Sequence, residues 1–289
     1  MRELSRTLVE KYFKADEAYL ATEEGNRDFF DHLLDRLVDD RRRVIPWLNR
    51  IRPLEGARIL EIGSGTGSSA VAFAEQGADV TGIDIDGPSL EVAQRRCELY
   101  GHRSVELVQA NIVGEHPVFA GRYDLIVFFA SLEHMLHEER LEGLRKAWAM
   151  LGSGGLLAVV ECPNRLWFFD DHTAWLPFFH WLPDQLAAEY AGRSPRASLG
   201  GDGGGAGLEA FLRQGRGVSF HEFQLALGSI EATLVAGDLA FHLRRFYPAF
   251  YLQHRFSIAH SYERLLRRIA PEIHPGFLHS MLNIVLRKP

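Results

Sequence analysis

The sequence predicts an α/β fold, in which a mainly parallel sheet has helices on both faces. From residue 58 onward, strand-like apolar runs alternate with helical patterns, which is typical of a parallel sheet. The runs are nearly continuous in apolar residues, as expected for strands that helices cover on both sides. The first run ends in a Gly-rich turn, and open sheets of this class bind nucleotides at the carboxyl ends of their strands.

The elements of this sheet can be placed in order along the chain. Strands are expected over 58–63, 79–84, 105–110, 123–129 and 155–160, with helices over about 67–76, 89–100 and 138–150. Further on, Ser219 and Glu222 fit a capping box that begins a helix ending at Leu227. Two late strands are expected over 230–235 and 280–286, separated by a helix near 248–270.

Residues 1–50 read as two helices, because apolar side chains recur at helical spacing over 28–38. The whole chain has 289 residues, 46% of them apolar and 24% charged, which suits one large domain with additions or two small ones. Cys97 and Cys162 match no disulfide or metal framework and are expected to be packing residues.

Charge and hydropathy exclude several classes of partner. A formal net charge of -6 argues against a nucleic-acid-binding protein, and the basic triplet 41–43 fits a solvated helix end. The N-terminus has no signal-peptide core, and no stretch approaches the ~20 apolar residues of a membrane span. We therefore expect a cytoplasmic protein with no membrane span and no nucleic-acid partner.

The Gly-rich turn has the pattern E-x-G-x-G-x-G over 61–67, and Ser68 stands where a dinucleotide fingerprint has Gly or Ala. Here the chain resembles the class I S-adenosylmethionine (SAM)-dependent methyltransferases, strongly over about 55–165 and more loosely over 216–289. The resemblance implies a Rossmann-like seven-stranded sheet of order 3-2-1-4-5-7-6 with strand 7 antiparallel. It also implies a methyltransferase domain over 51–289, behind an N-terminal helical cap over 1–50.

The same resemblance implies SAM as cofactor, S-adenosylhomocysteine as product, and roles for the strand ends. Glu61 would lie near the methionine ammonium and fix the turn, Asp84 would accept the ribose hydroxyls, and Asn111 would bond the adenine. Tyr12, Phe13 and Tyr19 of the helical cap would cover the cofactor, or else be core residues of their helix. The full set of expected cofactor-binding residues is Glu61, Gly63, Ser64, Gly65, Gly67, Asp84, Ile85, Asn111, Ile112, Ala130 and Ser131.

Three histidines are the candidate catalytic bases: His134, His172 and His221. His134 belongs to a Leu-Glu-His segment that lies beside the methyl donor in the family, although it could also be a structural turn. His221 could equally serve only the helix that Ser219 caps. Relatives in quinone biosynthesis hold a divalent metal with acids and a His around this segment. Ala130 stands where one of those carboxylates is expected, so we predict no metal.

Residues 163–218 interrupt the regular pattern and are expected to form a lid over the acceptor. The segment 163–183 is rich in Trp, Phe, Pro and His, and the Gly-rich run 200–207 reads as a flexible loop. The residue pattern over 163–183 resembles that of a methyltransferase subgroup linked to surface polysaccharides. This resemblance implies that the acceptor oxygen belongs to a sugar or glycolipid. A quinone or lipid acceptor, a purely structural lid and a homodimer contact remain alternatives.

Two other functions stay open at this point. One is an NAD(P)-binding oxidoreductase on a Rossmann-type sheet, against which Ser68 and the two late strands argue. The other is a SAM-binding protein without catalysis, which would use the aromatic segment as an interface. The leading expectation is a SAM-dependent methyltransferase acting on oxygen of a small-molecule or glycan acceptor.

Overall fold

The computed structural model describes every residue except 197–198, 200–206, 231–232 and 237–257. Within the described residues the strands form one seven-stranded sheet of order β3-β2-β1-β4-β5-β7-β6, so the predicted order is confirmed. The strands are β1 Arg58–Ile62, β2 Asp79–Asp84, β3 Glu106–Gln109, β4 Tyr123–Phe129, β5 Leu151–Pro163, β6 Leu234–Ala236 and β7 Met281–Arg287.

Most strand pairs are parallel, and β7 alone among the described strands runs in the opposite direction. β1 pairs in parallel with both β2 and β4, and β4 with β5. β7 runs antiparallel to both β5 and β6, which confirms the predicted antiparallel strand. β2 and β3 lie on one side of β1, and β4 and β5 lie on the other side, so the strand order switches direction between β1 and β4. Open α/β sheets bind ligands at such a switch point.

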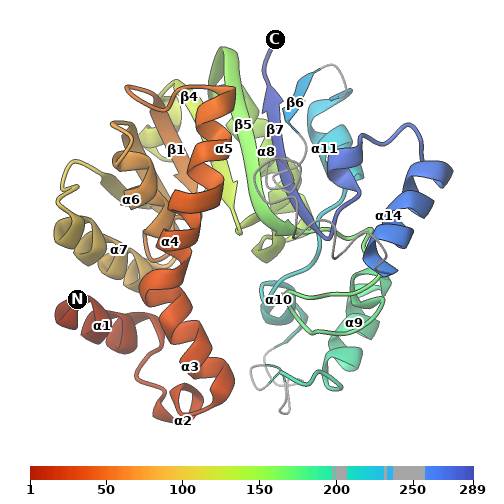
Figure 1. Ribbon diagram of the computed structural model, residues 1–289, viewed down its shortest axis with the longest axis horizontal. Helices are drawn as coiled ribbons and strands as arrows, with labels where there is room; N and C mark the ends of the chain where they lie inside the picture. The colour runs from red at the N-terminus through yellow and green to blue at the C-terminus, as the bar shows by residue number, and fades with distance from the viewer. Residues whose placement is uncertain (197–198, 200–206, 231–232, 237–257) are drawn as a thin grey trace.

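Helices cover both faces of the sheet, because successive side chains of a strand point to opposite faces. Ile59 and Val127 pack into one core with α4 (Arg36–Asp39), α5 (Ile45–Ile51) and α6 (Ser68–Ala74). Leu60 and Ile126 pack into the other core, with α8 (His137–Met150) and α11 (Phe220–Leu227). α7 (Gly87–Tyr100) lies beside α6 on the first face (Figure 1).

The N-terminal part is more segmented than the two helices expected. It contains α1 (Arg2–Thr7), α2 (Glu17–Leu20) and α3 (Glu23–Phe30), and from α3 the chain stays helical through α4 into α5. Side-chain caps divide the segments: Asp16 accepts a bond from the Tyr19 amide at 2.9 Å, and Thr22 one from the Gly25 amide at 2.9 Å. The predicted helix over 28–38 is confirmed as part of this continuous path.

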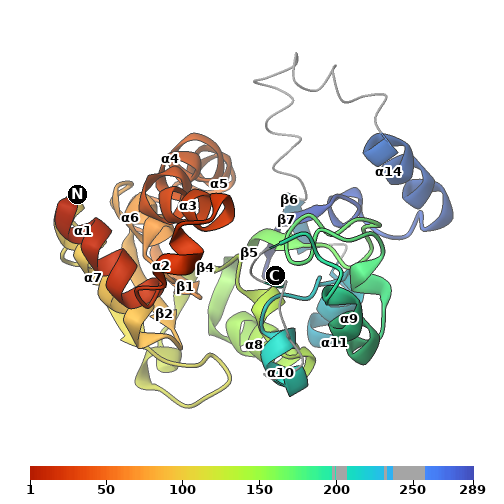
Figure 2. The same cartoon turned by 90° about the horizontal axis from the view of Figure 1, so that it is seen from below.

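The region after β5 has a small core of its own. α9 (Asp184–Ala191) and α10 (Gly207–Leu212) pack around Phe179 and Phe211. Seen from below, α1–α3 and α9–α10 lie on opposite sides of the molecule (Figure 2).

The late elements agree in part with their expected bounds. α14 (Ile258–Ile269) covers the second half of the helix expected near 248–270, and β6 the end of the strand expected over 230–235. Ile230 and Thr233 lie outside β6, so the expected strand began too early. Residues 231–232 and 248–257, and most of the Gly-rich run, lie outside the described residues. Among the described helices, none combines the length and the apolar character that crossing a membrane requires.

Candidate active site

The Gly-rich turn after β1 is a backbone surface that tolerates no side chains at two positions. Gly63 has φ +80°, and a Cβ there would lie 2.4 Å from Cβ of Ser131. Gly67 has φ +79°, and its Cβ would lie 2.8 Å from Cβ of Ala93. Gly65, at φ +50°, faces open space instead. The turn therefore leaves bare backbone exposed between two tight contacts, which lets a ligand lie against it.

Asp84, at the end of β2, is bonded to this turn. Its Oδ2 accepts a hydrogen bond of 2.8 Å from the Gly65 amide, and its Oδ1 one of 2.9 Å from the Asp86 amide. Burial raises the pKa of the carboxyl group, an effect that these amides oppose. Each carboxylate oxygen has a further lone pair, so Asp84 can still accept from a pair of hydroxyl groups.

Glu61 supports the turn from beneath. Its carboxylate is fully buried and accepts hydrogen bonds from the hydroxyls of Ser64, at 3.1 Å, and Ser69. Burial raises the pKa of Glu61 to about 7, although both serines lower it. Glu61 does not line the cavity described next, so its place in the structure is under the turn.

A cavity of about 1020 Å³ opens at the carboxyl ends of the strands. That volume is at the upper end for small-molecule sites and leaves room for two ligands. The exposed side chain of Ile85 offers an apolar surface beside Asp84. The structure brings together ten of the eleven expected cofactor residues there, namely Gly63, Ser64, Gly65, Gly67, Asp84, Ile85, Asn111, Ile112, Ala130 and Ser131.

Two of the three candidate histidines also line this cavity. His134 follows β4 in a short 3-10 turn, Leu132–His134, and His172 comes from the segment after β5. The chain enters the turn through Ala130, which has φ +42°, a strained conformation of the kind that clusters at functional sites. His221 is exposed on α11 and lines a separate, smaller cavity.

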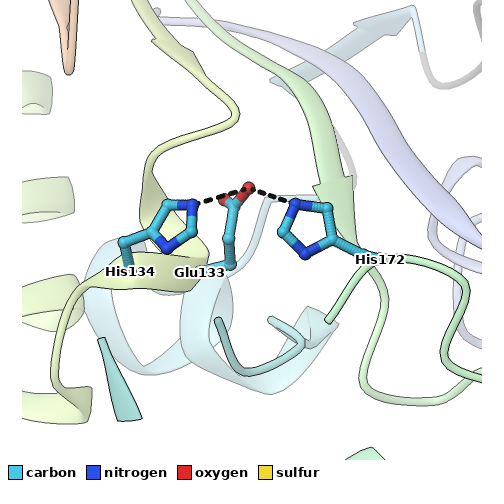
Figure 3. Close-up of side chains that lie close together, drawn as sticks. All are labelled: Glu133, His134 and His172. Atoms are coloured by element: carbon cyan, nitrogen blue, oxygen red, sulfur yellow. Dashed lines mark ion pairs between the residues drawn. The ribbon is translucent and has the colours of Figure 1, made fainter. Parts of the chain in front are cut away.

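His134 and His172 both face the carboxylate of Glu133 (Figure 3). Oε1 of Glu133 lies 3.8 Å from Nε2 of His134 and 3.6 Å from Nε2 of His172. The Glu133 side chain is fully buried, and neither carboxylate oxygen has a hydrogen-bond partner. Burial is the main cause that lowers the pKa of His172, and the charge of Glu133 opposes it.

The segment that carries His172 is organised by a buried aspartate. Asp170 accepts hydrogen bonds from the amides of His172, at 3.0 Å, and Thr173, at 2.8 Å. Nε2 of His180 lies 3.2 Å from its Oδ1. Burial opposes the charge of Asp170, but His180 and the neighbouring amides outweigh it and lower the pKa to about 2. The aromatic segment is therefore an ordered wall of the cavity.

Sequence reasoning missed the residue that joins the helical cap to the turn. Arg96, on α7, is fully buried and donates to the carbonyls of Thr66, at 2.8 Å, Leu33, at 3.0 Å, and His32. Burial lowers its pKa to about 10. The sequence does contain one indication of this burial, because Arg96 follows Val92 by four residues and therefore lies on the same buried face of α7.

Of the three aromatic residues expected over the cofactor, one reaches the cavity. Tyr12 lines it, beside His32. Phe13 packs in a small core with Leu4 and Leu8, which agrees with the alternative that it is a core residue.

Comparison with known proteins finds similarity for the central part of the chain. Residues 59–155 match the family described as methyltransferase domain. The cypemycin N-terminal methyltransferase of a Streptomyces species is 30% identical over 137 residues, 46% of this chain and 52% of the relative. The ubiquinone biosynthesis O-methyltransferase of Paracidovorax citrulli is 33% identical over 89 residues, 31% of this chain and 37% of the relative.

The chain thus spans about half or less of the length of these curated relatives. The solved CcbJ methyltransferase of Streptomyces caelestis is similar over 44% of this chain and 49% of its own, at 25% identity and a TM-score of 0.39. Residues 59–155 of this chain therefore match a methyltransferase domain, and the sheet around them has the strand order 3-2-1-4-5-7-6 that the resemblance to class I SAM-dependent methyltransferases implied.

Proposed function

We propose that this protein is a SAM-dependent methyltransferase that methylates oxygen of a small, ring-bearing acceptor. The observation that carries the cofactor part is the bond between Asp84 and Gly65, because a carboxylate that could accept the ribose hydroxyls then lies next to bare backbone in one cavity. Gly63, Asn111 and Ile85 would complete the binding surface. When bound, SAM supplies a methyl group that its sulfonium already activates.

The acceptor would lie between the 3-10 turn and the segment after β5. His134, His172 and Trp175 line the cavity on this side, and the guanidinium of Arg196 lies 5.4 Å from the Trp175 ring centroid. An aromatic face with polar neighbours suits a sugar ring, which stacks on the indole and bonds through its hydroxyls. Holding the acceptor oxygen in line with the methyl group lowers the barrier by orientation alone.

A quinol is the second candidate acceptor. It would stack on Trp175 in the same way, and a curated relative is named as an O-methyltransfer enzyme of ubiquinone biosynthesis. A phenolic hydroxyl ionises more readily than a sugar hydroxyl and so depends less on a base. The two acceptors therefore differ in how strongly the reaction should slow below neutral pH.

The test is release of S-adenosylhomocysteine by the full chain, with a panel of sugar, glycolipid and quinol acceptors. Turnover with one class identifies it, and Trp175→Ala should then raise KM more than it lowers kcat. The matched control is Trp148→Ala, since Trp148 lies on α8 and does not line the cavity. Cofactor binding without turnover on any acceptor would favour a non-catalytic SAM-binding protein, and binding of NAD(P) in place of SAM would favour an oxidoreductase.

A further inference from the structure

A buried carboxyl group without a hydrogen-bond partner lies at the wall of the cavity. The Glu133 side chain is 0% exposed, and both carboxylate oxygens lack a hydrogen-bond partner. The backbone of the same residue is satisfied, because Arg140 donates to its carbonyl at 3.0 Å. A buried, unpaired carboxylate is strongly unfavourable, so a group that complements it should bind there.

Two imidazoles face this carboxylate, and their hydrogen bonds define their tautomers. Nδ1 of His134 lies 2.8 Å from the Arg213 carbonyl, which can only accept, so Nδ1 carries the proton. The Thr173 hydroxyl donates to the Gly215 carbonyl at 3.1 Å and therefore accepts from Nδ1 of His172, also at 3.1 Å. In each neutral ring the lone pair of Nε2 is then free, and it is Nε2 that lies near Glu133.

We propose that Glu133, His134 and His172 bind a divalent first-row transition-metal ion. One ligand atom from each side chain lies within 4.8 Å of the other two, and two of the pairs are 3.6 and 3.8 Å apart. Metal–ligand distances of about 2.0–2.1 Å in a tetrahedral site imply ligand separations of about 3.3 Å. Small rotations of the two rings would close that difference.

The surroundings match those of a metal site. Ligating histidines generally donate their second ring N–H to a carbonyl or another acceptor, as both rings do here. The two ring side chains are 44% and 24% exposed, so the open side of the site faces the cavity. Two imidazoles with one carboxylate favour an ion such as Zn²⁺, Fe²⁺ or Co²⁺ over Mg²⁺, which prefers oxygen ligands.

Protonation of the rings is the competing source of positive charge. At 3.6 and 3.8 Å, however, neither ring nitrogen is within normal hydrogen-bond distance of the carboxylate. The separation leaves room for an ion between the three groups.

The ion would bind the acceptor through an open coordination position, and this step rests on the proposed function. Binding to the ion would lower the pKa of an acceptor hydroxyl, so that its proton could pass to solvent. The acceptor oxygen would then be able to form a bond to the methyl carbon of SAM, while the electron pair of the breaking carbon–sulfur bond would go to sulfur. The sequence predicts no metal, because Ala130 stands where a carboxylate ligand is expected. In this proposal His172 takes the place of that missing ligand, and a bound ion would overturn the prediction.

The test measures metal binding without cofactor or acceptor. The full chain is stripped with a chelator and titrated with Co²⁺ by absorption and with Zn²⁺ by calorimetry. We expect one ion per chain, and affinities at least about 100-fold weaker in Glu133→Gln and in His172→Ala. His102→Ala, at the end of α7 and outside the cavity, is the matched control and should bind like the wild type.

Thermal unfolding provides a second measurement that does not depend on activity. Metal should raise the Tm of the wild type and leave that of Glu133→Gln unchanged, while metal-free Glu133→Gln should be at least as stable as the wild type because it loses a buried carboxyl group that has no hydrogen-bond partner. Wild-type protein that binds neither ion, or that binds equally in both site variants, would overturn the proposal. Binding of S-adenosylhomocysteine is measured separately, so failure of the metal site and failure of the methyltransferase assignment are distinguishable.

Discussion

The Asp84 carboxylate accepts a 2.8 Å hydrogen bond from the amide of Gly65. This bond joins the end of β2 to the turn after β1, so the acid that we propose for cofactor binding shares one surface with bare backbone. Glu61 supports the same turn from below through Ser64 and Ser69. The predictions below follow from this arrangement and from the contacts that hold the opposite wall.

Replacing Gly63 by alanine should distort the cofactor surface. The positive φ costs about 1–2 kcal/mol for a residue with a Cβ, and the contact of 2.4 Å with Ser131 adds a clash with side-chain atoms that β4 positions. Gly56→Ala is the matched control, since Gly56 has φ +68° and nothing within 4 Å of its Cβ position. Denaturant unfolding should show the larger loss for Gly63→Ala, together with weaker SAM binding; equal losses in both variants would contradict the account of this turn.

Glu61 should make the protein less stable as the pH rises toward neutrality. Its pKa is about 7 in the folded chain against 4.5 ordinarily, because of burial. Between these values the folded state binds more protons than the unfolded state, so the free energy of unfolding falls with rising pH. Glu61→Gln has no carboxyl group to titrate at this position. Its free energy of unfolding should therefore fall with rising pH by on the order of 3 kcal/mol less than that of the wild type.

Urea unfolding at a series of pH values between 4.5 and 8 would check this slope. Glu138→Gln, on the exposed side of α8, should keep the wild-type slope. An unchanged slope in Glu61→Gln would show that the buried carboxyl is not the group that titrates.

Arg140 should be among the most sensitive positions of the wall opposite the turn. Its side chain is 1% exposed, and it donates to the Glu133 carbonyl at 3.0 Å and to Glu222 Oε1 at 3.0 Å. Arg140→Ala removes the guanidinium that pairs with the buried Glu222 carboxylate, and it takes one of two donors from the Glu133 carbonyl, which keeps the Arg216 amide. We expect a loss of about 3–5 kcal/mol. Arg145→Ala on the same helix removes an exposed side chain that bonds one carbonyl at 3.3 Å, and chemical denaturation should show a change of less than about 1 kcal/mol. Similar losses for both variants would refute this role of Arg140.

The sheet and the cofactor end of the cavity could be predicted because their signals are local. Apolar runs predicted the strands, and the spacing from Glu61 to Gly67 predicted the turn, which lies next to Asp84 because parallel strands end at the same edge. Ten of the eleven expected cofactor residues line one cavity for this reason.

The other wall could not be predicted, because it depends on contacts between segments distant in sequence. His172 reaches Glu133 only through the fold of the segment after β5, which Asp170 holds in place. Arg96 reads as an ordinary charged helix residue until the N-terminal helices cover it. Helical spacing puts Arg96 on the same side of α7 as the buried Val92, but it does not say which groups either side chain contacts.

Calorimetric titration of SAM and S-adenosylhomocysteine into the wild type and Asp84→Asn tests the central claim most directly. Loss of the carboxylate removes an acceptor for the ribose hydroxyls while leaving a side chain of the same shape beside Gly65. The account predicts micromolar binding to the wild type and a loss of at least about tenfold in the folded variant, since hydrogen bonds to charged groups contribute about 1.5–3 kcal/mol. Wild-type protein that is folded and binds neither ligand, or a variant that binds as tightly as the wild type, would contradict it.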